Sequence, residues 1–397
     1  MLLSMKYWDR EASDASNVVV VTGIGMVTAI ASNRENTWQG VLRGGSGIRF
    51  DSQLQIPVAR IDYLQDSHSS RSQCLLEKAT FEAIAEANSH TKLEIPLNNC
   101  GVVIGSSRSH QQELELLLDN SKNSKQSLIE NQWWQCQPAN LSSRIASLLQ
   151  THAPVLAPMA ACATANWAIA QACELIRSGQ CDVAIAGATD AALTPLTIAG
   201  FQKINVLAKS GVYPFSQERE GFALGEGAAA LVLESLDSAK RRGVSIYGRV
   251  LGWGITNDAY HATSPNPDNQ SAAIAIQDCL TRSQIRADEI GYVNVHGTAT
   301  QMNDAREAQL IQKFFPASKV SATKGATGHT LGATGMIEAA FCLLALRDRL
   351  LPPCVGLRTL AFDLNMVKET ERSPDLRYVL NFSFGFGGQN AIIAFGQ

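Results

Sequence analysis

Charged residues are scarce in this sequence, and neither sign predominates. Asp, Glu, Lys and Arg make up 17% of the 397 residues, and 33 basic against 36 acidic side chains leave a net charge of −3. A chain of this length with so few charges is expected to bury a large core, which excludes disorder as its main state. The near balance of charge supplies no overall field for nucleic acid or an anionic membrane, so we expect neither as a partner.

Long hydrophobic runs are also missing. The most apolar stretch, residues 18–31, is too short to cross a bilayer. Residues 1–16 are polar and charged and lack the apolar segment of a secretory signal, so we expect them to form a tail. These two absences predict a cytoplasmic protein.

Nine cysteines are present, but no two of them form a CxxC pair. The odd number and the scattered positions argue against a disulfide framework, and the missing spacing argues against a zinc motif, so we expect no metal. Most of these side chains should be small buried apolar groups. The useful question is which one has a chemical role.

Apolar runs alternate with amphipathic segments along the chain, which predicts an α/β fold with buried sheets covered by helices. An extended PVLAPMAAC (154–162) precedes an apolar helix at 165–178, and KVSATKG (319–325) precedes a second one that ends near Arg347. This repetition predicts two duplicated halves, residues 17–247 and 248–397. The first strand, 18–31, is expected to be broken by Gly23 and Gly25.

Cys162 has the most unusual setting of the nine cysteines. It lies in AACATAN (160–166), between an extended segment and the start of a helix near Ala165. A strained turn would expose the sulfur, and a helix N-terminus favours the thiolate and offers free N–H groups to an oxyanion. An inert buried cysteine is the alternative interpretation.

Two histidines also have unusual settings. His296 ends a buried strand in VNVHGTAT (293–300), and His329 lies in the Gly/Thr-rich helix entry KGATGHTLGATG (324–335). Each could be a structural side chain. A thiolate with two imidazoles, however, fits acyl transfer, in which one imidazole polarises a thioester carbonyl and the other stabilises an enolate. The segment FGFGGQN (384–390) could bring its backbone close to a substrate or simply form a tight turn.

Together these segments resemble the condensing enzymes of the thiolase superfamily, in particular the elongating β-ketoacyl–acyl carrier protein synthases of types I and II. The similarity extends from VVVTGIGMVTAI (19–30) to FSFGFGGQNAIIAF (382–395). It includes YPFSQEREGFALGEGAAALVLE (213–234), NVHGTATQMNDAREA (294–308) and VSATKGATGHTLGATGMIEAA (320–340). The resemblance implies a thiolase-like fold of five αβαβα layers and usually a homodimer, although heterodimers occur.

The resemblance also implies roles for individual residues. Cys162 matches the acyl-accepting nucleophile, His296 and His329 match the pair that binds the malonyl thioester and supports decarboxylation, and Lys324 matches the active-site lysine. The remaining matches are the gating Phe386, whose N–H joins that of Cys162 in the oxyanion hole, its neighbour Phe384, the acids Glu307 and Glu338 near the lysine, and the pantetheine-binding Thr298 and Thr300.

The implied reaction is a decarboxylative Claisen condensation of a Cys-bound acyl group with malonyl–acyl carrier protein, in fatty-acid or specialised polyketide-type biosynthesis. The partners are acyl carrier protein and its acyl and malonyl thioesters, and no cofactor is needed because the carrier brings its own phosphopantetheine. The alternative is a non-elongating subunit like the chain-length factors, which usually lose the nucleophile. A thiolase would need a second cysteine near the C-terminus, and an initiating synthase would have Asn where His329 stands.

Several positions depart from the family pattern. Ala165 stands where Gly or Ser is common, and Arg108, in GSSRSH (105–110), stands where an apolar side chain lines the acyl pocket. The segments 106–160 and 201–213 are shortened. We therefore expect a specialised acyl pocket that prefers short or polar acyl groups, unless Arg108 points away and pairs with an acid at the dimer interface.

Overall fold

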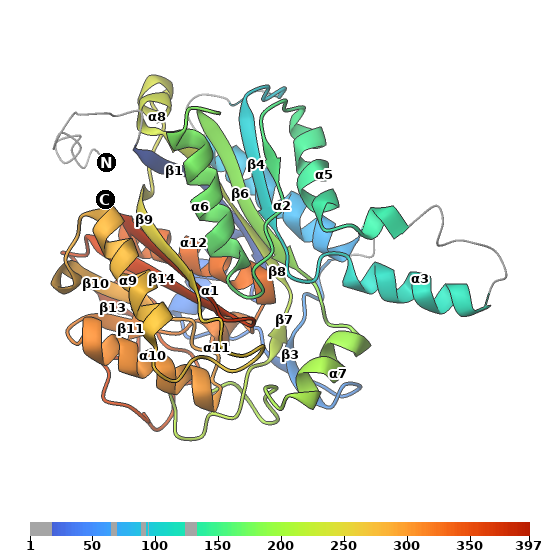
Figure 1. Ribbon diagram of the computed structural model, residues 1–397, viewed down its shortest axis with the longest axis vertical. Helices are drawn as coiled ribbons and strands as arrows, with labels where there is room; N and C mark the ends of the chain where they lie inside the picture. Colours follow the sequence, from blue (N-terminus) through green and yellow to red (C-terminus); the bar gives the residue numbers. More distant parts are fainter. Residues whose placement is uncertain (1–17, 65–69, 89–92, 94, 124–132) are drawn as a thin grey trace.

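The computed structural model describes the chain except for residues 1–17, 65–69, 89–92, 94 and 124–132 (Figure 1). The tail expected at 1–16 therefore lies outside the described residues. Ten strands of the described part form one continuous mixed sheet.

The order of strand pairing repeats halfway across this sheet. From one edge the strands are β5 (Val155–Leu156), β4 (Cys100–Gly105), β6 (Val183–Asp190), β8 (Gly227–Ser235) and β1 (Val19–Thr28). From the other edge they are β11 (Lys319–Ser321), β10 (Ile290–Asn294), β14 (Tyr378–Gly385), β15 (Gln389–Gly396) and β9 (Gly248–Asn257). In both sets the first three strands pair in parallel and the next two pairings are antiparallel. A duplicated unit would produce this order, while the bounds 17–247 and 248–397 stay a prediction.

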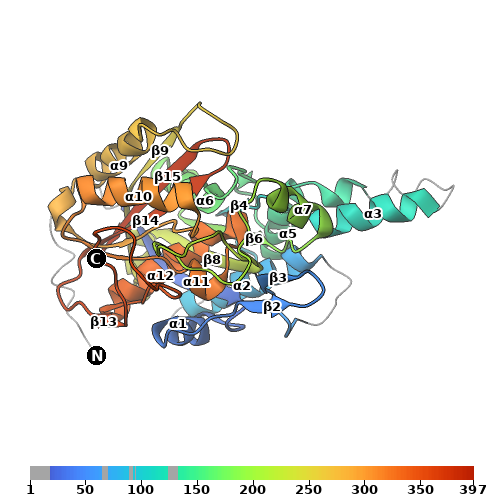
Figure 2. The same cartoon turned by 90° about the horizontal axis from the view of Figure 1, so that it is seen from below.

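Helices fill the space between the two strand sets and cover them on the outside (Figures 1 and 2). α6 (Thr164–Arg177) and α12 (Thr334–Asp348) pack against each other and against strands of both sets. α2 (Arg71–Ala87) and α5 (Ala139–Leu149) cover the first set, and α9 (Gln270–Ser283) and α10 (Gln301–Phe314) cover the second. The five αβαβα layers of an α/β protein are thus present, as expected.

The central position of α12 follows from its composition. Every residue from Thr334 to Leu346 is buried, so the helix has no polar face, as a helix enclosed between two sheets requires. The outer helix α2 is amphipathic instead, and Ser70 caps its N-terminus by accepting a hydrogen bond from the N–H of Gln73.

The glycines of β1 do not break the strand, contrary to the expectation. β1 runs from Val19 to Thr28 with one irregularity after Val21. A Cβ atom at Gly23 would lie 2.1 Å from the carbonyl oxygen of Ala83, and one at Gly25 would lie 1.9 Å from that of Ala79. The glycines therefore allow α2 to pack directly on the strand.

Shorter elements complete the fold around these layers. They are α1 (Arg34–Leu42), β2 (Arg49–Asp51), β3 (Ile56–Ala59), α3 (Gln111–Asn123), η3 (Trp133–Cys136), α7 (Pro195–Lys203), β7 (Leu224–Gly225), α8 (Leu236–Arg242), η4 (Ala287–Glu289), α11 (Lys324–Thr327), η5 (Leu331–Ala333), β12 (Leu350–Leu351) and β13 (Glu371–Arg372). Within the described part of the chain, no helix combines the length and the apolar character needed to span a bilayer.

Candidate active site

Cys162 lies on a strained turn at the entrance to the central helix α6. The preceding residue, Ala161, has a φ of +48°, a conformation that costs energy for any residue with a side chain. The N–H of Ala163 bonds back to the carbonyl of Ala160, and α6 begins at Thr164. The turn holds the sulfur at the helix N-terminus, 8% exposed.

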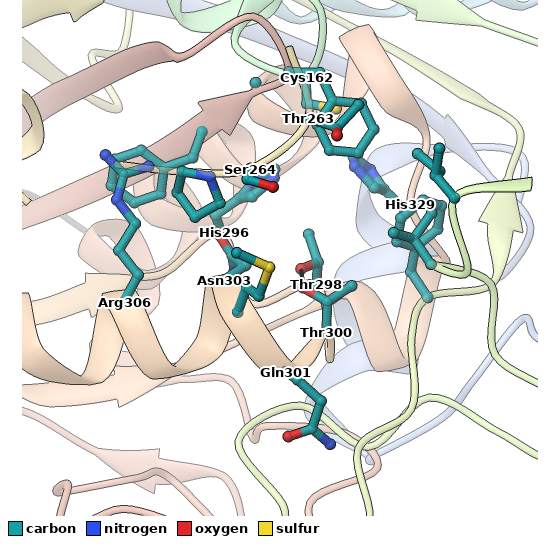
Figure 3. A pocket seen from close by; sticks show the side chains of 18 of the residues that line it. Cys162, Thr263, Ser264, His296, Thr298, Thr300, Gln301, Asn303, Arg306 and His329 are labelled. Carbon is teal, nitrogen blue, oxygen red and sulfur yellow. Dashed lines mark hydrogen bonds between the residues drawn. The ribbon is translucent and has the colours of Figure 1, made fainter. Parts of the chain in front are cut away.

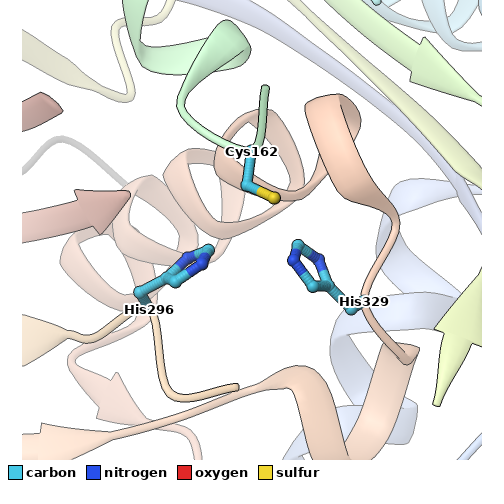
Figure 4. Close-up of side chains that lie close together, drawn as sticks. All are labelled: Cys162, His296 and His329. Atoms are coloured by element: carbon cyan, nitrogen blue, oxygen red, sulfur yellow. The ribbon is translucent and has the colours of Figure 1, made fainter. Parts of the chain in front are cut away.

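The two histidines meet at this sulfur (Figure 4). The Sγ of Cys162 and one nitrogen from each of His296 and His329 all lie within 4.8 Å of one another. The imidazole centroids are 5.3 Å apart and the rings are nearly perpendicular, at 84°. Segments from both halves of the chain therefore converge on one thiol.

The contacts of His329 fix the position of its proton. Its Nδ1 accepts a hydrogen bond from the backbone N–H of Leu331 at 3.2 Å, so the neutral ring carries its proton on Nε2. The Thr334 hydroxyl lies 3.0 Å from the same Nδ1. In Figure 4 the tip of the ring points toward Cys162. His329 thus presents an N–H donor to the space beside the sulfur.

His296 is held by its backbone. Its N–H donates to Glu307 Oε1 at 2.6 Å, and the next N–H, of Gly297, donates to Oε2 at 2.6 Å. The ammonium of Lys324 donates to the His296 carbonyl and forms an ion pair with Glu338 at 2.7 Å. Among the described residues, Nδ1 of His296 has no hydrogen-bond partner. Glu307, Lys324 and Glu338 therefore position the histidine without contacting its ring nitrogens.

Burial controls the protonation of the site. Desolvation, with the nearby Lys324 charge, lowers the pKa of His296 and of His329 well below the usual value, so both rings are neutral near pH 7. Burial also raises the pKa of Cys162 to about 12. The thiol is thus favoured over the expected thiolate, because desolvation outweighs the stabilisation of the thiolate by Lys324, Arg108 and the Phe386 N–H.

The two acids behind His296 respond to burial in the same way. Burial, and after it the Asp304 carboxylate, raises the pKa of Glu307 to about 8 against the N–H donors of Gly297 and Asn303. Burial raises the pKa of Glu338 to about 7, against the attraction of Lys324. Both groups titrate near neutral pH.

The loop between β14 and β15 closes the other side of the sulfur. The backbone N–H of Phe386 reaches Cys162 and favours its thiolate. A Cβ atom at Gly385 would lie 2.7 Å from the carbonyl oxygen of Ala160 and 3.1 Å from the N atom of Cys162, so only glycine fits. The ring of Phe384 meets His296 edge-on at 6.2 Å, and Phe386 lies 6.2 Å from Phe201.

A cavity of about 320 Å³ joins these groups. Cys162, both histidines, Phe384 and Phe386 line it, as do Thr298 and Thr300, whose hydroxyl oxygens are 2.9 Å apart (Figure 3). Lys324, Glu307 and Glu338 are fully buried behind His296 and do not appear in its lining.

The two candidate acyl-pocket residues lie elsewhere. Ala165 is buried in the central core and is absent from the lining of this cavity. Arg108 is exposed, with its guanidinium 5.5 Å from the centroid of the Phe201 ring, and Phe201 does line the cavity. The predicted roles of both residues stay predictions.

Two important residues escaped the sequence analysis. Asp190, at the end of β6, accepts hydrogen bonds from Ser106, Ser107 and Arg108 and also from the N–H of Gly332, close to His329. Its position at the carboxyl end of a buried strand was the available signal. Phe222 meets His329 edge-on at 4.8 Å, and its aromatic character alone gave no such signal.

Comparison with known proteins identifies the family. The family described as "Beta-ketoacyl synthase, N-terminal domain" matches residues 59–239, and "Beta-ketoacyl synthase, C-terminal domain" matches residues 247–358. The chain belongs to the β-ketoacyl synthases. This synthase is 33% identical to the 3-oxoacyl-[acyl-carrier-protein] synthase 2 of Mycobacterium leprae (strain TN) over 414 residues, which cover 95% of this chain and 96% of the relative.

Solved ketosynthase structures share the fold of this synthase. "AntDE:AntF (apo): type II PKS acyl-carrier protein in complex with its ketosynthase bound to the hexaketide" matches with a TM-score of 0.89 and 26% identity over 96% of this chain and 99% of that one. "The ishigamide ketosynthase/chain length factor" matches with a TM-score of 0.86 and 27% identity over the same shares, 96% and 99%. The thiolase-like fold is confirmed, and the synthase is an acyl-transferring condensing enzyme of the elongating kind.

Proposed function

We propose that Cys162 carries the growing acyl group, and that His296 and His329 activate a malonyl thioester for decarboxylative condensation with it. The carrier is the acyl carrier protein in both half-reactions. The observation that supports this assignment most strongly is the meeting of one thiol and two neutral imidazoles within 4.8 Å at the end of a cavity.

The first half-reaction loads the acyl group. The sulfur of Cys162 attacks the carbonyl carbon of the acyl thioester, and the carrier thiol leaves. Since the resting group is a thiol, its proton must be removed during the attack, and the neutral imidazole of His296, unlike the N–H donor His329, can accept and pass on that proton. The proton ends on the departing carrier thiol.

The second half-reaction forms the new carbon–carbon bond. The Nε2–H of His329 and the imidazole of His296 hold the thioester oxygen of the malonyl group, so that loss of CO₂ leaves a stabilised enolate. The enolate carbon attacks the acyl-Cys162 carbonyl, whose oxygen receives the N–H groups of Cys162 and Phe386. The thioester then breaks, Cys162 regains a proton, and the β-ketoacyl carrier leaves two carbons longer.

The remaining roles extend this proposal to the partners. Thr298 and Thr300 hold the pantetheine arm, which enters along the cavity that they line. A dimer, of identical chains or with a chain-length-factor partner, and a cytoplasmic location complete the proposal. The acyl carrier protein in the AntDE:AntF complex and the paired subunits of the ishigamide protein support such partners. A non-elongating role is not favoured, because Cys162 and both histidines are present and converge.

The proposal includes no metal. The proposed reaction uses the Cys162 thiol and both imidazoles to bind the acyl and malonyl thioesters, which leaves none of these groups to a metal ion. Dialysis against EDTA should therefore leave the loading of Cys162 unchanged, and a loss that zinc restores would contradict this.

The test of the function is intact-mass measurement after incubation with a panel of acyl–carrier thioesters. Wild type should gain one acyl group, and malonyl–carrier should then yield a β-ketoacyl product and CO₂. Failure of every acyl thioester to add mass would contradict the proposal.

A further inference from the structure

A second cavity lies beside the catalytic one. It measures about 310 Å³ and is formed by the loop after β4, the start of α3, η3 and Met159, three residues before Cys162. Its lining combines the apolar side chains of Leu114, Trp133, Pro138 and Met159 with Arg108, His110 and serine and glutamine side chains, and none of its described lining residues is acidic. The cavity therefore offers hydrogen-bond donors without a negative charge.

His110 is oriented toward this space. It is only 5% exposed, and its Nε2 has no hydrogen-bond partner among the described residues. Its Nδ1 lies 2.8 Å from the hydroxyl oxygen of Ser70, which already accepts the N–H of Gln73. The serine proton can therefore go to Nδ1, which leaves Nε2–H as a donor that lacks an acceptor.

Arg108 is the second donor without an acceptor among the described residues, and hydrogen bonds to Asp190 fix its backbone. Its N–H and the Ser106 hydroxyl both donate to Asp190, at 2.9 Å and 2.7 Å. The guanidinium stacks on Phe201, at 5.5 Å from the ring centroid, and no carboxylate of the described chain forms an ion pair with it. No hydrogen bond to a described residue uses the guanidinium N–H groups of Arg108, so these donors remain available.

Arg108 stands between the two cavities. It lines the second, and the Phe201 ring under its guanidinium lines the first together with Cys162. Its charge also acts on the nucleophile, where it opposes the effect of burial on the pKa of Cys162. An acyl group attached to Cys162 can therefore interact with this guanidinium.

We propose that Arg108 selects acyl groups that end in a carboxylate, and that His110 supplies a further donor in the cavity that receives this end. The proposal rests on the function above, in which Cys162 is acylated. A guanidinium pairs with a carboxylate through two parallel hydrogen bonds, whereas an alkyl end would leave both donors unpaired. The substrate class is thus a dicarboxylic acid held as its half-thioester.

The test compares two pantetheine thioesters of equal chain length, hexanoyl and adipoyl, in competition for Cys162. In wild type the adipoyl group should load preferentially by intact mass. The adipoyl-to-hexanoyl ratio should fall by roughly ten- to one-hundred-fold in Arg108→Leu, the size expected for hydrogen bonds to a charged group. Arg108→Lys should give an intermediate ratio because it keeps the charge but not the planar fork. Arg241→Leu, which removes an exposed arginine of α8, is the matched control and should keep the wild-type ratio.

Each other result counts against the proposal. If wild type prefers hexanoyl, or if Arg108→Leu leaves the ratio unchanged, the selection by Arg108 is wrong while acylation of Cys162 stands. If Arg108→Leu weakens the dimer in sedimentation at an unchanged ratio, the arginine pairs with a partner subunit instead. If neither thioester adds mass to wild type, the function itself fails together with this inference.

Discussion

The two sides of Cys162 differ in how their charged side chains are paired. On the side of His296 and His329, charged groups are fully buried and paired, as in the Lys324–Glu338 contact at 2.7 Å. On the side of Arg108, Asp190 accepts a hydrogen bond from the Arg108 backbone N–H, but no acidic side chain of the described chain pairs with the guanidinium. His110 Nε2 has no hydrogen-bond partner among the described residues.

This difference assigns the reaction to the side of the two histidines and the selection of the acyl group to the side of Arg108. Malonyl decarboxylation is the same in every cycle, so its donors are fixed in advance and need no adjustment. The acyl group is the part of the substrate to be selected, and the donors proposed to bind it have no acceptor within the described chain. On this side the buried donor is His110 Nε2, and a buried donor without an acceptor costs stability.

The largest effect should come from the group that the two sides share. Cys162→Ala should abolish acyl loading, because no other described thiol lies beside the two imidazoles. Intact mass after incubation with acyl thioesters measures the loss, and a circular dichroism spectrum like that of wild type serves as the folding control. A variant that still gains acyl mass would place the nucleophile elsewhere. Cys162→Gln, which resembles an acylated site, should keep malonyl decarboxylation.

The catalytic side should show the next largest effect. His296→Ala and His329→Ala should slow decarboxylation by roughly 10²–10³-fold, the usual loss for one oxyanion-stabilising donor, and should slow acyl loading less. Release of CO₂ from malonyl–carrier and the rate of mass gain with acyl–carrier measure the two steps separately. An equal loss in both steps would mean that the imidazoles act mainly on the thiol of Cys162.

Stability should distinguish the two sides directly. Lys324→Met leaves Glu338 as an unpaired buried acid and should lower the free energy of unfolding by about 3–5 kcal/mol, whereas Arg108→Leu should change it by less than about 0.5 kcal/mol. Urea unfolding at fixed protein concentration and pH measures both. The double variant Lys324→Met/Glu338→Leu should recover much of the loss, and a large loss from Arg108→Leu would remove the contrast.

The sequence allowed the catalytic set to be predicted because each member has a local signature. Cys162 follows an extended segment and precedes a helix, while His296 and His329 are adjacent to glycines and threonines where a backbone turns. Such signatures arise within a few residues and do not depend on tertiary packing. The layered fold was predictable for a similar reason, since alternating apolar strands and helices are a local pattern.

Properties that depend on packing could not be predicted in this way. The pKa of Cys162 was expected to be lowered, but burial raises it to about 12. Asp190 joins the Arg108 loop to Gly332 across long stretches of sequence, and Gly23 and Gly25 serve a contact with α2 that the strand itself does not reveal. Burial and long-range contact decide each of these cases.

The smallest effect concerns how stability depends on pH. Glu307 has a folded-state pKa of about 8 against about 4.3 in an unfolded chain, so near pH 7 the folded state holds a proton that the unfolded state has lost. Glu307 therefore contributes stability that is fully present below about pH 4.3 and is lost as the pH rises through about 8. The free energy of unfolding should fall by about 1 kcal/mol between pH 7 and 8, a window in which unfolded histidine is already mostly neutral.

Urea unfolding at pH 7.0, 7.5 and 8.0 measures the slope. Glu307→Gln cannot titrate and should make the slope shallower by about 1 kcal/mol over this window, with the contribution of Glu338 remaining, while Arg108→Leu, on the other side of Cys162, should keep the wild-type slope. A wild-type stability that rises across this window would contradict the prediction. It would show that Glu307 is already ionised at pH 7, as a carboxylate that accepts hydrogen bonds from the N–H groups of His296 and Gly297.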